Sequence, residues 1–234
     1  MELFFHKTID INNSKFNFSD EESRHLSKVL RKQPGSVVSV TDGKGIEVHV
    51  EIQNINSRKS TGIIKETFIH PFPKYKTHIA IAPTKNIVRL EWFLEKATEI
   101  GIHRITPILC QNSERKVIKN ERLSKIIQSA LKQSQQFHLP KIDELISFET
   151  FVQQQNSGLI AHCNIGNKFD LVDLKPNNKT NCVLIGPEGD FSLNEIAFAE
   201  KYNFKSISLG NQRLRTETAA LVACHTLSLI NKNL

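Results

Sequence analysis

From residue 76 onward, short apolar runs alternate with longer amphipathic segments, and this alternation restricts the fold more than any other feature of the chain. The apolar runs predict strands, and they are "HIAIAP" (78–83), "RITPILC" (104–110), "SGLIAHC" (157–163), "NCVLIG" (181–186) and "FKSISLG" (204–210). Helices are predicted at 86–101, 120–137 and 192–202, with a last helix ending near residue 232. Continuous apolar strands separated by helices are typical of a parallel sheet that is buried on both faces. The fold class predicted for this part is α/β.

Residues 1–72 have a different pattern and predict a separate, mostly β module. The segments "SVVSVTDG", "GIEVHVEIQ" and "STGIIKETFI" are rich in β-branched residues and are separated by turn signals. One helix is expected at about 20–31, where Ser19 and Glu22 have capping-box spacing. Two prolines in "HPFPKYK" (70–76) indicate a linker. The sequence therefore predicts a small barrel-like domain at 1–72 and an α/β domain at 73–234.

The composition excludes several classes of protein. No apolar run approaches the roughly 20 residues that span a bilayer, and the N-terminus lacks the basic region of a signal peptide. Each of the four cysteines, Cys110, Cys163, Cys182 and Cys224, lies in an apolar run without the spacing of metal ligands. They are expected to be buried free thiols in a reducing compartment. We therefore expect a cytoplasmic protein with no bound metal and no membrane association.

Positive charge is concentrated in one segment of the chain. The formal net charge is +7, and residues 113–132 hold six basic and two acidic residues, with Arg115 and Lys116 at their start. Such a basic face favours a polyanion, although a solvated helix face is the alternative. In the first predicted helix, Arg24, Lys28 and Arg31 share one face at α-helical spacing, with His25 beside them.

Two predicted strands end in glycine-containing loops, "VLIGPEGDFS" (183–192) and "SISLGNQRLRTET" (206–218). In α/β sheets, ligands bind beyond the carboxyl ends of the strands. Pro187 between flexible glycines could bring backbone groups close to a ligand. An ordinary tight turn before a capped helix is the alternative. Neither loop has the Walker A or dinucleotide-binding pattern, so these ligands are not indicated.

The second loop places two arginines where a helix disfavours them. Arg213 and Arg215 lie at or just before the start of the last helix, whose N-terminus carries partial positive charge. The helix end and the guanidinium groups together favour an anion. By themselves, these residues indicate only a phosphate, a nucleic acid or another anionic ligand.

Taken together, "LIGPEGDFSLNEI" and "LGNQRLRTETA" resemble the SPOUT superfamily of S-adenosylmethionine-dependent RNA methyltransferases. Within it, the chain is similar to the family that methylates N3 of a uridine in small-subunit ribosomal RNA. "RHLSKVLRKQPGSVVSVTDGKG" (24–45) resembles that family's N-terminal PUA-like RNA-binding module, and "EWFLEKATEIGIHRITPILCQNSER" (91–115) resembles its core. The resemblance implies a trefoil knot in the C-terminal domain, a homodimer whose active site draws on both subunits, and small-subunit ribosomal RNA as the partner.

The resemblance also implies residue roles. The cofactor pocket would comprise Ala161 and His162 at a strand end, Ile185, Gly186, Glu188 and Gly189 in the first loop, and Leu209, Gly210, Asn211, Gln212, Leu214 and Thr216 in the second. Leu209 and Leu214 would enclose the adenine. RNA would contact Arg24, His25, Lys28, Arg31, Arg115 and Lys116.

Three residues are candidates for catalysis. Loss of the N3 proton leaves negative charge on the uracil oxygens, which a guanidinium group can stabilise. Arg215 is the first candidate for this role and Arg213 the second. Glu217 could pair with Arg215 and orient it, or could be a favourable acid in the first helical turn. The sequence indicates no residue as the proton acceptor, and solvent could serve.

The sequence departs from the family pattern at two informative places. Gly189-Asp190 stands where the family usually has two glycines, and Leu3 or Phe4 stands where an N-terminal arginine is common. Two other functions remain open, a knotted methyltransferase acting on ribose 2′-hydroxyls and a non-catalytic RNA-binding assembly factor. The base-methylating function is favoured by "LRTETA" and by the N-terminal module.

Overall fold

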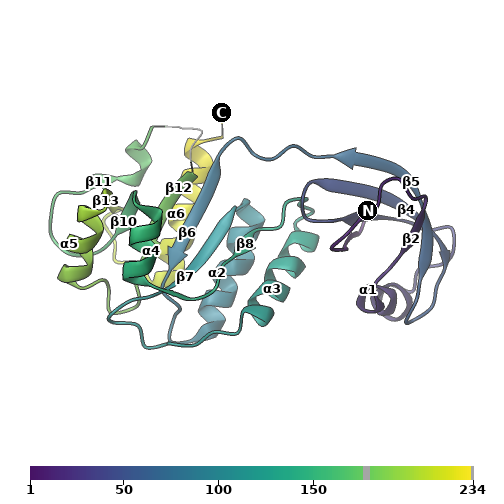
Figure 1. Ribbon diagram of the computed structural model, residues 1–234, viewed down its shortest axis with the longest axis horizontal. Helices are drawn as coiled ribbons and strands as arrows, with labels where there is room; N and C mark the ends of the chain where they lie inside the picture. The colour runs from purple at the N-terminus through teal and green to yellow at the C-terminus, as the bar shows by residue number, and fades with distance from the viewer. Residues whose placement is uncertain (176–179, 233–234) are drawn as a thin grey trace. The chain divides into compact units, whose positions relative to one another are not determined.

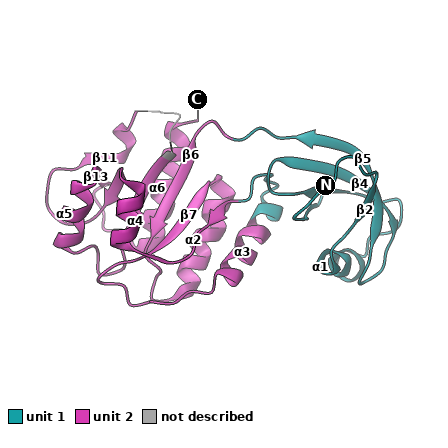
Figure 2. Ribbon diagram, viewed as in Figure 1, with its two compact units in different colours: residues 1–72, 131–139 teal, residues 73–130, 140–234 magenta. Residues whose placement is uncertain are grey.

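The computed structural model describes residues 1–175 and 180–232, and the chain forms two compact units within it (Figure 1). The first unit comprises Met1–Phe72 and Leu131–Leu139, and the second comprises Pro73–Ala130 and Pro140–Leu234 (Figure 2). Leu131–Leu139 lie within the predicted C-terminal domain, but they pack in the first unit.

The first unit is built on a mostly antiparallel sheet in the order β1-β3-β4-β5-β2. Its strands are β1 (Leu3–Phe5), β2 (Lys15–Asn17), β3 (Val37–Thr41), β4 (Ile46–Asn54) and β5 (Thr61–Ile69). Only β1 and β3 are paired in parallel among them. Alternate residues of β3 and β4, including Val38, Val40, Val48 and Val50, point into a core that also contains Phe4, Phe16 and Phe18.

The helix of this unit is not regular. It begins as α1 (Asp20–Arg24) and continues as a π-helical turn, η1 (His25–Val29), in which the Leu30 amide donates to the His25 carbonyl. Ser19 caps its start by accepting from the Glu22 amide at 3.3 Å. The reciprocal half of the expected capping box is absent from the described contacts, because the Glu22 carboxylate pairs with Lys132 at 2.9 Å instead. The α-helical spacing that places Arg24, Lys28 and Arg31 on one face therefore does not apply through η1.

Two glycines allow Leu131–Leu139 to join this unit. Gly43 and Gly45 have φ angles of +71° and +99°, and a Cβ on Gly43 would lie 2.8 Å from the Cβ of Leu139. The Gly45 amide donates to the Phe137 carbonyl at 2.9 Å, and the Leu139 amide donates to the Gly43 carbonyl at 2.8 Å. A side chain at either glycine would therefore prevent this close approach.

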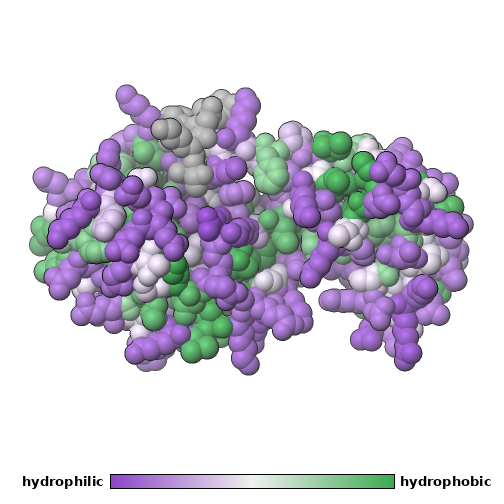
Figure 3. Space-filling view, in the orientation of Figure 1, coloured by the Kyte–Doolittle hydropathy of each residue, from purple (hydrophilic) through white to green (hydrophobic). Residues whose placement is uncertain are grey.

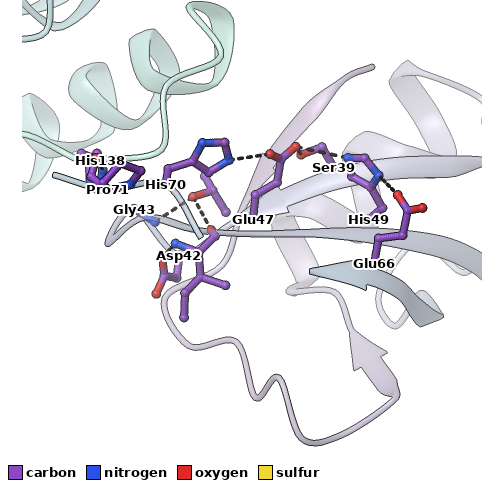
Figure 4. A network of polar contacts seen from close by, with 11 residues as sticks. Ser39, Asp42, Gly43, Glu47, His49, Glu66, His70, Pro71 and His138 are labelled. Carbon is purple, nitrogen blue, oxygen red and sulfur yellow. Dashed lines mark hydrogen bonds and ion pairs between the residues drawn. The ribbon is translucent and has the colours of Figure 1, made fainter. Parts of the chain in front are cut away.

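Beside this contact, Glu47 lies at the centre of a polar network (Figure 4). Its carboxylate accepts from Ser39 at 2.6 Å and bonds to the His70 ring at 2.8 Å, and His49 lies 3.3 Å away. Burial raises the pKa of Glu47, but the Ser39 and His70 hydrogen bonds and the neighbouring histidines outweigh it and hold the pKa below its ordinary value. The His70 ring also stacks on Phe137, with ring centres 3.7 Å apart.

The second unit contains a parallel sheet in the order β11-β13-β10-β12-β6-β7-β8, with β9 paired to β7. The strands are β6 (Lys76–Ile81), β7 (Arg104–Leu109), β8 (Lys141–Ile142), β9 (Ile146–Ser147), β10 (Gly158–Ala161), β11 (Phe169–Asp170), β12 (Thr180–Ile185) and β13 (Phe204–Ser208). Every pairing in the described sheet is parallel, as the apolar runs predict.

Helices cover both faces of this sheet (Figure 1). They are α2 (Ile87–Ile100), α3 (Asn120–Gln133), α4 (Phe148–Gln155), α5 (Leu193–Lys201) and α6 (Thr216–Ile230), with a 3₁₀ turn, η2 (Leu171–Asp173). Residues of α4 and α5 pack with Ala80, Ile160 and Leu184 in one core, while α6 packs on β6 and β12 and against α2. The α/β fold class is confirmed; the trefoil knot stays a prediction.

Local signals account for two helix ends in this unit. Gly101 ends α2 with a φ of +92°, as predicted. The capping box of Ser192 and Glu195 at the start of α5 is present in both directions. In contrast, α4 has no counterpart among the predicted elements.

Hydrophilic residues cover most of the face seen in Figure 3. Within the described part of the chain, no helix is both long and apolar enough to cross a membrane.

Candidate active site

The two glycine-containing loops meet at a pocket of about 650 Å³ in the second unit. The pocket lies where β10, β12 and β13 end, because the carboxyl ends of parallel strands share one edge of the sheet. Eleven of the twelve residues predicted to bind the cofactor line it, and Gly189 lies outside the lining. Arg213 and Arg215 are also in the lining, as are seven residues outside the predicted cofactor-binding set, namely Cys163, Lys168, Pro187, Asp190, Ile207, Ser208 and Ala219.

The first loop is held by contacts from neighbouring segments. The Gly186 carbonyl accepts from the Thr216 hydroxyl at 3.0 Å, which joins this loop to the start of α6. The Glu188 carboxylate accepts from the Lys85 amide at 3.0 Å. Gly186 is buried, and a Cβ there would lie 3.1 Å from the Phe191 ring. A side chain at position 186 would therefore press against the Phe191 ring.

The second loop ends at Arg215, the N-cap residue of α6. Arg215 makes no side-chain capping bond, and both Arg213 and Arg215 are exposed. Neither has an ion-pair partner among the described residues. Gly210 has a φ of +117°, which favours glycine at this bend. The two guanidinium groups are therefore free to interact with a ligand at the pocket.

Glu217 has a different partner from the one considered in the sequence. Its carboxylate is buried in the first turn of α6 and lies 3.7 Å from Arg89 Nε of α2. The second carboxylate oxygen, Oε2, is buried and has no hydrogen-bond partner among the described residues. Arg89 escaped notice in the sequence, although it is a cation in the first turn of a helix, the same unfavourable placement that singled out Arg213 and Arg215.

His162 lies at the third side of the pocket, at the end of β10. Its Nε2 is 3.0 Å from the Ser206 hydroxyl, and the Lys168 ammonium donates to its carbonyl at 2.9 Å. Partial burial and the charge of Lys168 lower the pKa of His162 below its ordinary value. The imidazole is therefore biased toward the neutral form.

The candidate RNA-binding residues fall into two groups. Arg24, Lys28, Arg31 and Lys116 have exposed side chains. Arg115 is half-buried and donates to the carbonyls of Thr84 and Lys85 at 3.0 and 2.6 Å, so its guanidinium already holds a loop.

The His25 side chain, like that of Arg115, is already engaged within the protein. It is half-buried, with its ring centre 5.7 Å from that of Phe4 and its Nδ1 3.7 Å from the Glu22 carboxylate.

The cysteines differ from the prediction at one position. Cys110, Cys182 and Cys224 are buried free thiols, but Cys163 is exposed at the pocket. The apolar run around it ends at β10, so Cys163 falls in the following loop. Burial raises the pKa of Cys224 to about 12.

The described residues contain no His, Cys, Asp or Glu group suited to a metal ion.

Comparisons with known proteins agree with this arrangement. Residues 70–228 match the family model of an RNA methyltransferase domain, and residues 18–65 match that of an RNA methyltransferase PUA domain. The chain is 36% identical to a probable rRNA-methyltransferase from Porphyromonas gingivalis, whose crystal structure superposes with a TM-score of 0.88 and covers 98% of this chain and 99% of that one.

Two further relatives cover nearly the whole chain. A putative methyltransferase from Legionella pneumophila, solved with bound S-adenosylmethionine, is 25% identical with a TM-score of 0.88, over 98% of this chain and 97% of that one. Ribosomal RNA small subunit methyltransferase E from Rickettsia conorii is 27% identical over 94% of this chain and 92% of its own length. The chain therefore belongs to the RNA methyltransferase family, with a PUA domain of that family preceding its methyltransferase domain.

Proposed function

We propose that this protein methylates N3 of a uridine in small-subunit ribosomal RNA, with S-adenosylmethionine as the methyl donor. The pocket between the two glycine-containing loops carries this proposal, because these loops bring together Arg213 and Arg215, which have no ion-pair partner among the described residues. The Rickettsia relative is named as a methyltransferase of small-subunit ribosomal RNA, which supports this RNA as the substrate. The Legionella relative was solved with bound S-adenosylmethionine, which supports this cofactor as the methyl donor.

The pocket has the size and lining that the donor requires. Its volume of about 650 Å³ lies within the range of small-molecule sites. Ile207, Leu209 and Leu214 supply apolar surface for an adenine. Backbone groups of residues 209–212 would bind the polar edge of the base, and the sulfonium would supply an electrophilic methyl group.

Arg215 and Arg213 would stabilise the uracil anion. When N3 loses its proton to solvent, negative charge spreads over O2 and O4, and the exposed guanidinium groups at the α6 N-terminus attract it. Bound S-adenosylmethionine would supply the methyl group to N3, and the electron pair of the broken carbon–sulfur bond would remain on sulfur. Positioning the ring beside the methyl group supplies the rest of the catalysis.

The exposed cations Arg24, Lys28, Arg31 and Lys116 would bind the RNA backbone. Contacts of this kind position RNA without reading its bases. We assign smaller roles to His25 and Arg115, because their side chains are engaged within the protein. We also propose that the N-terminal domain is residues 1–72, joined in packing by Leu131–Leu139, and that the methyltransferase domain is the rest of 73–234. A cytoplasmic location is proposed as well.

We also propose a homodimer through α2. Val88 and Trp92, one turn apart on this helix, are 58% and 41% exposed. Large apolar side chains at this spacing suit burial against a second copy. Light scattering should give twice the monomer mass, and Trp92→Glu should shift the protein toward monomer.

One assay tests the reaction. Purified protein is incubated with labelled S-adenosylmethionine and unmodified small ribosomal subunits, and the labelled nucleoside is identified by mass spectrometry. Label at N3 of uridine supports the proposal. Label in ribose would instead indicate a 2′-hydroxyl methyltransferase, and cofactor binding without label would indicate a non-catalytic assembly factor.

A further inference from the structure

Asp190 adopts a backbone conformation that is unusual for a residue other than glycine. Its φ angle is +64°, in the left-handed region. Both carboxylate oxygens accept backbone hydrogen bonds, Oδ2 from the Cys163 amide at 2.8 Å and Oδ1 from the Phe191 amide at 2.8 Å. One side chain thus connects the first loop to Cys163 in the loop after β10, although Asp190 and Cys163 are 27 positions apart.

The Asn112 side chain also holds the backbone of this loop, at Gly189 and Asp190. The Asn112 side-chain amide donates to the carbonyls of Gly189 and Asp190 at 3.2 and 3.1 Å. Asn112 lies in the loop after β7. A Cβ added to Gly189 would lie 3.1 Å from the Cβ of Asn112. The loop is therefore held both by the Asn112 side chain and by the bond to the Cys163 amide.

Asp190 and Cys163 both line the pocket, so the bond between them is part of its wall. A glycine at position 190 would adopt the observed φ without strain, but it would offer no acceptor to the Cys163 amide. The aspartate accepts the strain of a left-handed residue and gains two charge-assisted hydrogen bonds, which are stronger than neutral ones.

We propose that Asp190 is a positioning residue for the cofactor pocket, whose carboxylate ties residues 186–191 to Cys163 in the loop after β10. This proposal rests on the proposed use of S-adenosylmethionine at that pocket. The carboxylate acts by holding the loop in its binding conformation before the ligand arrives. Pre-organisation of this kind raises affinity by lowering the entropic cost of binding.

Three substitutions separate the contributions of the side chain. Asp190→Gly removes both acceptors and relieves the backbone strain, and Asp190→Ala removes the acceptors but keeps the strain. Asp190→Asn retains an acceptor oxygen and tolerates the left-handed conformation. The matched control is Asp173→Asn, at an exposed aspartate of η2.

Calorimetric titration with S-adenosylmethionine measures the effect on binding. We expect the dissociation constant to rise about tenfold in the glycine variant, more in the alanine variant and less in the asparagine variant. In the methylation assay, KM for the cofactor should rise in the same order while kcat at saturating cofactor changes by less than about twofold. The control should match the unsubstituted protein. Unchanged affinity in the glycine variant would overturn the proposal.

A second measurement tests the tie without any ligand. Amide hydrogen exchange at Cys163 should be slow in the unsubstituted protein and about tenfold faster in Asp190→Gly, because its acceptor is lost. Equal exchange rates would show that the tie is absent, whatever the enzyme acts on. Exchange at Cys163 could be faster in Asp190→Gly while the unsubstituted protein fails to bind S-adenosylmethionine. The hydrogen bond between Asp190 and Cys163 would then be supported, but the positioning role and the methyl donor would both be wrong. If the unsubstituted protein binds the cofactor but does not methylate RNA, only the proposed reaction fails.

Discussion

Arg89 Nε of α2 lies 3.7 Å from Glu217 Oε1 in the first turn of α6. Each of these residues is close to a helix start, and the pair joins the two helices beside the candidate pocket. Glu217 is 7% exposed, so it depends on this cation for compensation of a buried charge.

Arg89→Ala should therefore destabilise the protein. Removing one partner of a buried ion pair is costly, but Arg89 is 37% exposed, so we expect a loss of only about 1–2 kcal/mol. Urea unfolding measures this change. Arg58→Ala, at an exposed arginine, is the control and should change stability by less than about 0.5 kcal/mol. Equal effects of the two substitutions would show that the pair contributes nothing.

Arg215→Ala should separate catalysis from cofactor binding. The Arg215 guanidinium is exposed at the pocket and makes no capping hydrogen bond to α6. Its loss should therefore leave the fold and the cofactor affinity nearly unchanged. Turnover should fall by about 10²–10³, as for other groups that stabilise a developing negative charge. Single-turnover kinetics and calorimetry measure the two quantities. Arg213→Ala is expected to cost less, and full activity in Arg215→Ala would exclude the assigned role.

Thr216→Val should loosen the contact between the two pocket loops. The Thr216 hydroxyl donates to the Gly186 carbonyl at 3.0 Å, and valine has nearly the same shape without the donor. A lost buried hydrogen bond of this kind costs about 1 kcal/mol, so the cofactor dissociation constant should rise by up to about tenfold. Thr216→Ser keeps the hydroxyl and should bind as the unsubstituted protein does. Normal cofactor binding in Thr216→Val would show that the hydroxyl contributes nothing to the pocket.

His78 should make the protein less stable in mild acid. It is 1% exposed on β6, and burial, followed by the charge of Arg104, lowers its pKa from 6.5 to about 4. Between these values the unfolded chain binds a proton that the folded chain excludes. The free energy of unfolding should therefore fall as the pH drops from about 6.5 to about 4, by up to about 3 kcal/mol.

Urea unfolding across this pH range tests the prediction. His78→Gln removes the titrating group and should flatten the curve, although the lost bond to Thr106 will lower it overall. His225→Gln, at an exposed position of α6, should keep the original slope. A slope that persists in His78→Gln would assign the acid sensitivity to other groups.

Much of the α/β unit could be predicted because its signals are local. The strand runs, the glycine that ends α2 and the capping box of α5 each depend on residues within a few positions of one another. The meeting of residues 185–190 with 207–216 was also predictable, since parallel strands end at a common edge. Their assignment to a methyltransferase came from resemblance rather than from local patterns.

By itself, the sequence determined the alternation of strands and helices and the placing of both glycine-containing loops at one edge of a parallel sheet. Only the tertiary structure decided that Glu217 pairs with Arg89, that Asp190 binds the Cys163 amide and that Leu131–Leu139 packs in the first unit. Hydrophobic periodicity is a property of neighbouring residues, so it can be read along the chain. Which distant amide or cation meets a given carboxylate depends on where packing places each loop, and no local pattern records that.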